Sequence, residues 1–251
     1  MAQTKSMGKK KSSGLGENIR TIVYAVLIAL ALRTFAFEPF NIPSGSMMPT
    51  LLTGDYLFVS KYSYGYSRYS LAFGLPLFGG RIWGASPERG DVVVFRLPTD
   101  PKKDYIKRVV GLPGDKVQMI EGRLYLNGEM VERRRVSDFA VPIAADRTVM
   151  VNQYVETLPG GAEHMILEAS DSDHLDNTPE YEVPEGHFFM MGDNRDRSQD
   201  SRVMSIVGFV PEENLVGRAE IIWFSLRDAS FWQVWHWPTR LRFGRLLRDI
   251  S

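Results

Sequence analysis

The chain of 251 residues contains no cysteine. This absence excludes a disulfide, an iron–sulfur cluster, a thiolate zinc site and a cysteine nucleophile. Histidine is scarce as well, and the four residues His164, His174, His187 and His236 show none of the spacings of a metal site such as HExxH. We therefore expect neither a metal nor any other cofactor.

Net charge is also lacking, because 30 acidic residues balance 30 basic ones. No bulk charge attracts nucleic acid, and we expect no nucleic-acid partner. Beyond residue 37 the sequence shows no long helical periodicity and no internal repeat. It shows short apolar runs bounded by glycine, proline and polar turns, which are typical of β-strands. We expect strands at residues 56–60, 91–96, 105–110, 116–119, 123–126, 150–157, 164–169, 187–191, 206–210 and 220–225, with polar turns that include 98–103. The predicted fold class is mainly β, with mostly antiparallel sheets.

One long apolar run is present, at residues 19–37. It is about long enough to cross a bilayer once. Lysines cluster before it in the polar segment 1–18, so the positive-inside rule places the N-terminus in the cytoplasm and the rest of the chain outside. Two alternatives remain, a removable signal peptide cleaved after Ala29-Leu30-Ala31 and a buried helix of a soluble protein.

Two further segments are rich in aromatic residues. Residues 62–86 begin with Tyr62, Tyr64 and Tyr66 in strand-like alternation, and they predict either a hairpin on the core or an apolar flap on the membrane. Residues 231–251 begin with tryptophans and end in arginines, which favours a second contact with anionic lipid over a closing strand or helix. The acidic loop at 171–180 has no function that the sequence reveals.

Three segments could carry chemistry. In the first, Ser44 and Ser46 flank Gly45 between two prolines, a pattern that suits either a fixed nucleophile or an ordinary turn. In the second, Lys107 lies within an apolar strand-like run; burial could lower its pKa enough to make it a base, or it could extend from a strand edge into solvent. The third, residues 192–202, alternates acidic and basic side chains and reads as a solvated loop or as a buried brace of ion pairs.

Taken together and in this order, these segments resemble bacterial type I signal peptidases, the membrane-bound Ser/Lys endopeptidases that remove signal peptides from secreted proteins. The resemblance lies in four motifs: Pro43-Ser44-Gly45-Ser46-Met47-Met48-Pro49-Thr50-Leu51, Gly90-Asp91-Val92-Val93-Val94-Phe95, Tyr105-Ile106-Lys107-Arg108-Val109-Val110-Gly111-Leu112-Pro113-Gly114-Asp115 and Gly192-Asp193-Asn194-Arg195-Asp196. It is weak at residues 130–185 and in the C-terminal tail.

The resemblance implies a role for each matching residue. Ser46 would be the nucleophile and Lys107 its general base, with the Ser46 N–H and the Ser44 hydroxyl as the oxyanion hole. Ser198 would orient the lysine, supported by an ion pair of Asp200 with Arg202. The implied groove for small side chains, one and three positions before the cleaved bond, comprises Phe40, Ile42, Pro43, Met47, Leu51, Val94, Asp104, Tyr105 and Ile106. Arg197 departs from the family, which commonly has asparagine before the orienting serine.

The resemblance also implies an organisation. We expect a cytoplasmic tail at 1–18, an anchor at 19–37, a catalytic β domain at 38–115 and 185–230, an inserted β subdomain at 116–184, and the aromatic and basic tail at 231–251. The expected location is the inner (plasma) membrane, the expected partners are preproteins and lipid, and the expected state is a monomer. The alternatives are a specialised pilin-type processing peptidase, a Ser/Lys self-cleaving repressor, which the absence of a DNA-binding helical domain disfavours, and a membrane-tethered β module that only binds peptides.

Overall fold

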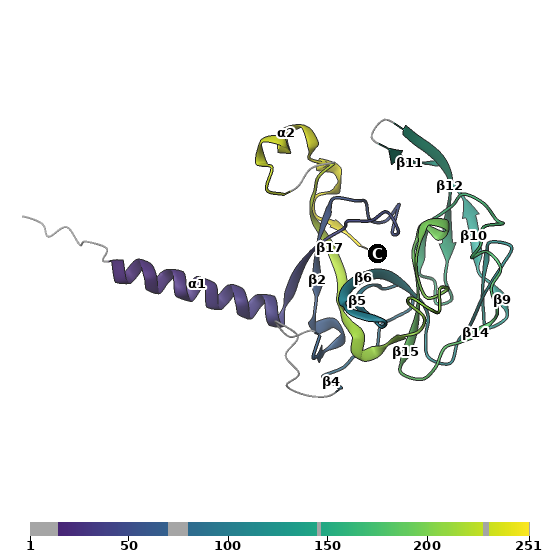
Figure 1. Ribbon diagram of the computed structural model, residues 1–251, viewed down its shortest axis with the longest axis horizontal. Coiled ribbons are helices and arrows are strands. Elements are labelled where there is room, and N and C mark those ends of the chain that lie inside the picture. Colours follow the sequence, from purple (N-terminus) through teal and green to yellow (C-terminus); the bar gives the residue numbers. More distant parts are fainter. Residues whose placement is uncertain (1–14, 70–79, 145–146, 228–230, 251) are drawn as a thin grey trace, which may run out of the picture.

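The computed structural model describes residues 15–69, 80–144, 147–227 and 231–250. One long helix, α1 (Leu15–Phe35), extends away from a body of antiparallel β-sheets (Figure 1). Within α1, Gly16–Phe35 is long and apolar enough to cross a membrane, and the side chains of its central residues are exposed rather than packed on the body. The helix begins four residues earlier and ends two residues earlier than the predicted anchor, because Phe37 already belongs to a strand.

The largest sheet positions the residues that carry the four motifs. Its path is β1 (Phe37–Asn41), β2 (Asp55–Ser60), β17 (Leu215–Ser225), β5 (Val92–Leu97), β6 (Asp100–Gly111), β15 (His187–Met191) and β16 (Val210–Pro211), and β18 (Arg248–Asp249) pairs with β17. All the pairings along this path are antiparallel. β5 is rich in β-branched valines and is buried on both faces, as suits a central strand.

Among the strands of this sheet, β1 and β6 both have open backbone edges in the described part of the chain. β1 is at the end of the sheet and pairs only with β2. β6 pairs with β5 over most of its length, but β15 pairs only with its final segment, from Arg108 to Gly111. The stretch of β6 that precedes Arg108 therefore has one unpaired side, which can accept an added strand.

Residues between β6 and β15 form two smaller sheets. One contains β10 (Glu132–Arg135), β12 (Arg147–Thr157) and β11 (Phe139–Ala144), with β13 (Glu163–Glu168) paired to β12; the other contains β14 (Tyr181–Glu182), β7 (Lys116–Ile120), β8 (Arg123–Leu126) and β9 (Glu129–Met130). Phe189 and Met191 of β15 share one buried cluster with Val117 and Met119 of β7. This cluster packs the second small sheet onto the large one.

Several local predictions were wrong. Tyr62–Tyr64 forms a 3-10 turn, and only β3 (Tyr66–Ser67) is a strand, paired with β4 (Arg81–Ile82). Residues 70–79 of the predicted flap lie outside the described residues.

The predicted strand at 206–210 is reduced to β16, and the predicted turn at 98–103 is mostly β6, which begins at Asp100. β10 was not predicted, because Glu132–Arg135 has no apolar alternation and is held by backbone pairing with β12.

The C-terminal tail folds back onto the large sheet. It contains a 3-10 turn (Val234–His236), α2 (Trp237–Arg240), a second 3-10 turn (Phe243–Arg245) and β18. The Arg245 guanidinium donates to both carboxylate oxygens of buried Asp55, at 3.0 and 2.5 Å. The tail thus closes the edge of the fold, as one of its two sequence interpretations predicted.

Candidate active site

Ser46 lies in the loop between β1 and β2, and neighbouring residues fix its position. Met47 and Leu51 are fully buried and anchor the loop to the core below it. Asn194 holds it from the opposite side, because its side-chain amide donates to Gly45 O at 3.0 Å and its backbone N–H donates to Ser46 O at 3.1 Å. These contacts leave the Ser46 side chain at the surface of a cleft while the backbone is held on both sides.

The polar groups around Ser46 face one another. Ser44 Oγ lies 3.4 Å from Ser46 Oγ. The N–H of Ser46 donates to no group among the residues that the structure describes. An N–H and a hydroxyl with this placement are the kinds of donor that stabilise an oxyanion.

Lys107 reaches Ser46 from β6. Its Nζ lies 2.8 Å from Ser46 Oγ and 2.8 Å from Ile106 O, and the side chain is only 3% exposed. Burial lowers the pKa of Lys107 to about 8, although the carboxylates of Asp200 and Asp193 act in the opposite direction. A lysine with this pKa is partly neutral near neutral pH, so it can accept a proton from the serine.

The direction of Lys107 is set by its neighbour. Successive side chains of a strand point to opposite faces. Arg108 is 1% exposed and donates to both oxygens of Asp193, at 2.9 and 2.8 Å. Thr50, in the serine loop, donates to the same carboxylate at 2.5 Å. The ion pair therefore joins the strand of Lys107, the loop of Ser46 and the segment 192–202.

The predicted ion pair of Asp200 and Arg202 is formed, with two hydrogen bonds of 2.9 Å. Asp200 also accepts from the Gly192 N–H at 3.0 Å. Burial acts to raise the pKa of Asp200. The Arg202 guanidinium and these hydrogen bonds outweigh burial and lower this pKa, and Ser198 adds to the lowering. Ser198 is buried, but among the described residues no hydrogen bond joins it to Lys107. The Ser198 hydroxyl has no hydrogen-bond partner among the described residues.

A second buried pair lies behind this site. Arg195, in the 3-10 turn Arg195–Arg197, makes a two-bonded ion pair with Glu156 of β12. His164 Nε2 lies 3.4 Å from Glu156 and 4.0 Å from Asp193. Burial lowers the pKa of His164 to about 4, so this histidine is neutral at physiological pH. It fills space between charged pairs and adds no charge.

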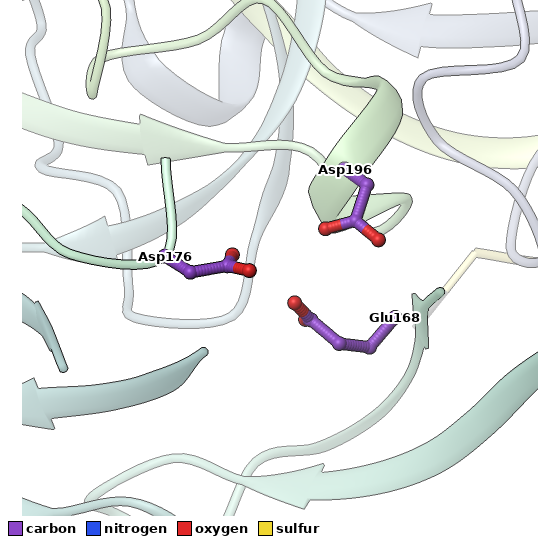
Figure 2. Close-up of side chains that lie close together, drawn as sticks. All are labelled: Glu168, Asp176 and Asp196. Atoms are coloured by element: carbon purple, nitrogen blue, oxygen red, sulfur yellow. The ribbon is translucent and has the colours of Figure 1, made fainter. Parts of the chain in front are cut away.

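Among the described residues, one group of side chains is close enough to hold a metal ion. Figure 2 shows the carboxylates of Glu168, Asp176 and Asp196 pointing toward one another, and their ligand oxygens lie within 4.8 Å. Asp196 accepts hydrogen bonds from Ala169 N and Ser170 N, at 2.6 and 3.1 Å. Burial, with the nearby Asp196 carboxylate, raises the pKa of Glu168 to about 9, so at neutral pH Glu168 keeps its proton. A neutral Glu168 lowers the negative charge of the group.

Two cavities meet at Ser46. The first, about 530 Å³, lies on the Lys107 side and contains seven of the predicted groove residues; its lining is Phe40, Asn41, Ile42, Pro43, Ser44, Ser46, Val94, Asp104, Tyr105, Ile106, Lys107, Arg197 and Gln199. The second, about 890 Å³, lies on the other side and is lined by the serine loop, by β11 and the start of β12, and by arginines. Met47 and Leu51 line neither cavity, because they form part of the core beneath the first.

Sequence reasoning missed several residues of this site. Asn194 had been noted only within a charged segment, yet it holds the serine loop by two hydrogen bonds. Asn41 and Gln199 line the first cavity, and Gln199 accepts a hydrogen bond from Tyr105 at 3.0 Å. The alternation of Phe40 and Ile42 around Asn41 was the available signal for Asn41. Gln199 depends on the path of a loop, which no periodicity reveals.

Comparisons with known proteins show the family of this chain. The family model described as signal peptidase, peptidase S26, matches residues 15–224. A signal peptidase I of Rickettsia typhi is 43% identical over 96% of both chains, and one of Rickettsia prowazekii is 45% identical over 92% of both. A crystal structure of a signal peptidase I from Enterococcus faecalis is 25% identical, covers 53% of this chain and 97% of its own, and has a TM-score of 0.31. The family match and the identity over nearly the whole chain show that this protein belongs to the signal peptidase family, peptidase S26.

Proposed function

We propose that this chain removes signal peptides from preproteins as a serine endopeptidase, with Ser46 as nucleophile and Lys107 as general base. The observation that carries this proposal is the 2.8 Å contact between Lys107 Nζ and Ser46 Oγ at a buried lysine whose pKa is lowered to about 8. A peptide-binding module would have no need of such a contact.

The chemistry follows from the geometry. Neutral Lys107 takes the proton of Ser46 as Oγ attacks the carbonyl carbon of the scissile bond. The Ser46 N–H and the Ser44 hydroxyl donate to the oxyanion that forms. The protonated lysine gives its proton to the leaving amine, which leaves an acyl-enzyme on Ser46. Water activated by the same lysine then hydrolyses the ester and restores both residues.

The first cavity suits the residues that precede the cleaved bond. It lies between edge strand β1 and the unpaired side of β6, so an extended peptide can add as a strand and bond to both. Apolar side chains of Phe40, Ile42 and Val94 limit the space beside it and favour small residues such as alanine. Ser198, Asp200 and Arg202 support the lysine by fixing the loop that packs against it.

Signal peptidases are membrane-associated, and α1 is a candidate span. We assign its N-terminal side to the cytoplasm and the β body, as two domains with the second at about 116–184, to the outer side of the inner membrane. Aromatic side chains surround the exit of α1: Phe35 contacts Tyr66 at 5.9 Å between ring centroids, and Tyr66 contacts the exposed Trp83 at 6.3 Å. Trp232 and Trp235 in the tail are also exposed and would provide the second lipid contact.

The absence of cysteine makes the topology easy to test. Single cysteines replace Ser12, before the helix, and Ser172, which is exposed on the body. A membrane-impermeant maleimide added to intact spheroplasts should label Ser172→Cys and not Ser12→Cys. The reverse pattern would overturn the assigned orientation.

The activity is tested with the full chain in detergent and a preprotein that has an Ala-x-Ala site. Mass spectrometry should locate one cut after the second alanine. Ser46→Ala and Lys107→Ala should each reduce the rate by about 10⁴-fold or more. The matched controls are Ser172→Ala and Lys116→Ala, which are exposed and should cut at the wild-type rate. Normal cleavage by Lys107→Ala would refute the lysine base.

A further inference from the structure

The second cavity has a distinct electrostatic character. It shares Ser44, Ser46 and Arg197 with the first cavity, so the two spaces join at the nucleophile. Among the described residues, its lining contains four arginines and no aspartate, glutamate or lysine. These residues are Ser44, Gly45, Ser46, Met48, Leu52, Thr53, Phe139, Ala140, Val141, Pro142, Ile143, Arg147, Thr148, Asn194, Arg197, Arg227 and Arg242.

Three of the arginines have no acidic partner in the part of the chain that the structure describes. Arg147, Arg197 and Arg227 are exposed, and none of them forms an ion pair with any residue of the described ranges. Arg242 differs, because its Nη1 lies 3.8 Å from Asp55 and donates to Thr53 O at 3.0 Å. The three exposed guanidiniums come from separate segments, at the start of β12, in the turn before Ser198 and after β17. Together they set a positive potential in one hollow.

A bound substrate must pass through this hollow. If the residues before the cleaved bond lie in the first cavity, the scissile carbonyl is at Ser46. The chain that follows the bond then leaves on the other side of Ser46, where the second cavity adjoins the nucleophile. An opening of about 890 Å³ is large enough for several residues of an extended peptide.

We propose that the second cavity binds the segment that follows the cleaved bond and selects acidic over basic side chains in it. This inference rests on the proposed peptidase function and adds a specificity site on the product side. An acidic side chain gains attraction to Arg147, Arg197 and Arg227, whereas a lysine meets repulsion from all three. The apolar floor of Met48, Phe139 and Val141 packs the peptide backbone and the side-chain stems.

A peptide fits the cavity better than an anionic lipid headgroup. The arginines surround a hollow that opens directly on Ser46, and one of them, Arg197, lines the peptide cavity as well. A headgroup at that position would block the nucleophile. The charge is therefore placed where it acts on a substrate.

The test compares three preproteins that are identical through the Ala-x-Ala site and differ only in the second and third residues after the cut, which are Glu-Glu, Gln-Gln or Lys-Lys. The full-length protein is assayed in neutral detergent. We expect kcat/KM to fall in the order Glu, Gln, Lys, with about threefold to fivefold between successive substrates, the size of one exposed ion pair. The preference should shrink at 0.5 M salt, because these charges are exposed to solvent.

Single variants Arg147→Gln and Arg227→Gln should each reduce the Glu:Lys ratio, and the double variant should reduce it further, to the preference that Arg197 supplies. Arg134→Gln is the matched control, since Arg134 is an exposed arginine on β10 that does not line the cavity, and it should keep the wild-type ratio. Thermal unfolding of each variant confirms that it is folded.

The outcomes separate this inference from the function on which it rests. Cleavage of all three substrates at equal rates would overturn the acidic preference and leave the peptidase function intact. Arginine variants with an unchanged ratio would also overturn it, and they would point to a lipid headgroup site if the same variants bound anionic vesicles less tightly. Failure of the wild-type protein to cut even the Gln-Gln substrate would overturn both.

Discussion

Arg108 and Asp193 form a buried ion pair whose four interacting atoms meet in two hydrogen bonds of 2.9 and 2.8 Å, with both side chains at most 2% exposed. Arg108 follows Lys107 directly, and Asp193 precedes Asn194, which holds the serine loop. The pair thus fixes the relative position of two segments that are 85 residues apart. Burying two charges is unfavourable in itself, so its benefit lies in positioning.

Removal of one partner should therefore affect both stability and rate. Asp193→Asn leaves the Arg108 charge buried without its counter-charge, and we expect the free energy of unfolding to fall by about 3–5 kcal/mol. Cleavage should fall at least 100-fold, because a displacement of about 1 Å at the lysine is enough for such a loss. Chemical denaturation and kcat at a temperature where the variant is folded measure the two effects. Asp171→Asn is the control, since Asp171 is exposed where it pairs with Arg133. A wild-type kcat in Asp193→Asn would contradict the positioning role of the Arg108–Asp193 pair.

The pKa of Lys107 predicts how the rate depends on pH. Burial lowers this pKa to about 8, so the reactive neutral form increases as the pH rises from 6 to 9. We expect log kcat/KM to rise with a slope of about one below pH 8 and to level off above it. The profile is measured with a preprotein that has no titrating group near the cleavage site, and circular dichroism checks that the fold is intact over the same range. A flat profile between pH 6 and 9 would exclude a lysine base with this pKa.

Gly192 lies against both Ser198 and the backbone of the serine loop. A Cβ at this position would lie 2.1 Å from Ser198 Oγ and 2.6 Å from Ser46 O, distances at which the backbone of the serine loop would have to move. Gly192→Ala should therefore reduce kcat by about 100-fold or more while KM changes less. Gly244→Ala is the matched control, because no atom lies within 4 Å of its added Cβ. Equal values of kcat for the two variants would show that the serine loop can move aside without loss of activity.

The parts of this protein that could be predicted from sequence are those with local signals. The valine run of β5, the Gly-Asp turn before β2 and the apolar run of β15 each mark a strand by composition. Lys107 and Ser46 were found through motif resemblance, and a contact across 61 residues cannot be read from periodicity. The strand pairing of β10, the arginines of the second cavity and the acidic group around Glu168 depend on tertiary packing. Their sequence context is that of ordinary solvated residues.

The stability of a Glu168 variant tests whether Glu168 is protonated in the acidic group that it forms with Asp176 and Asp196. Its pKa is raised from 4.5 to about 9 in the folded chain, so as the pH rises above 4.5 the unfolded chain loses the proton first and the folded state becomes relatively less stable. Glu168→Gln removes this effect, and we expect the free energy of unfolding at pH 7 to rise by about 1–3 kcal/mol. The gain should vanish at pH 4, where both states are protonated. Glu163→Gln, at an exposed position of the same strand, should change stability little at either pH.

The same variant distinguishes a protonated Glu168 from a bound cation. Oxygens as much as 4.8 Å apart could both coordinate one calcium ion, whose ligands lie at about 2.3–2.6 Å. Calcium at 1 mM would then raise the melting temperature of the wild-type protein, and Glu168→Gln would lose that rise together with part of its stability. With a protonated Glu168, calcium and EDTA leave the wild-type melting temperature unchanged and Glu168→Gln melts higher. We expect the second result, because the raised pKa of Glu168 keeps this side chain neutral at pH 7 and so relieves its repulsion from Asp196 and Asp176.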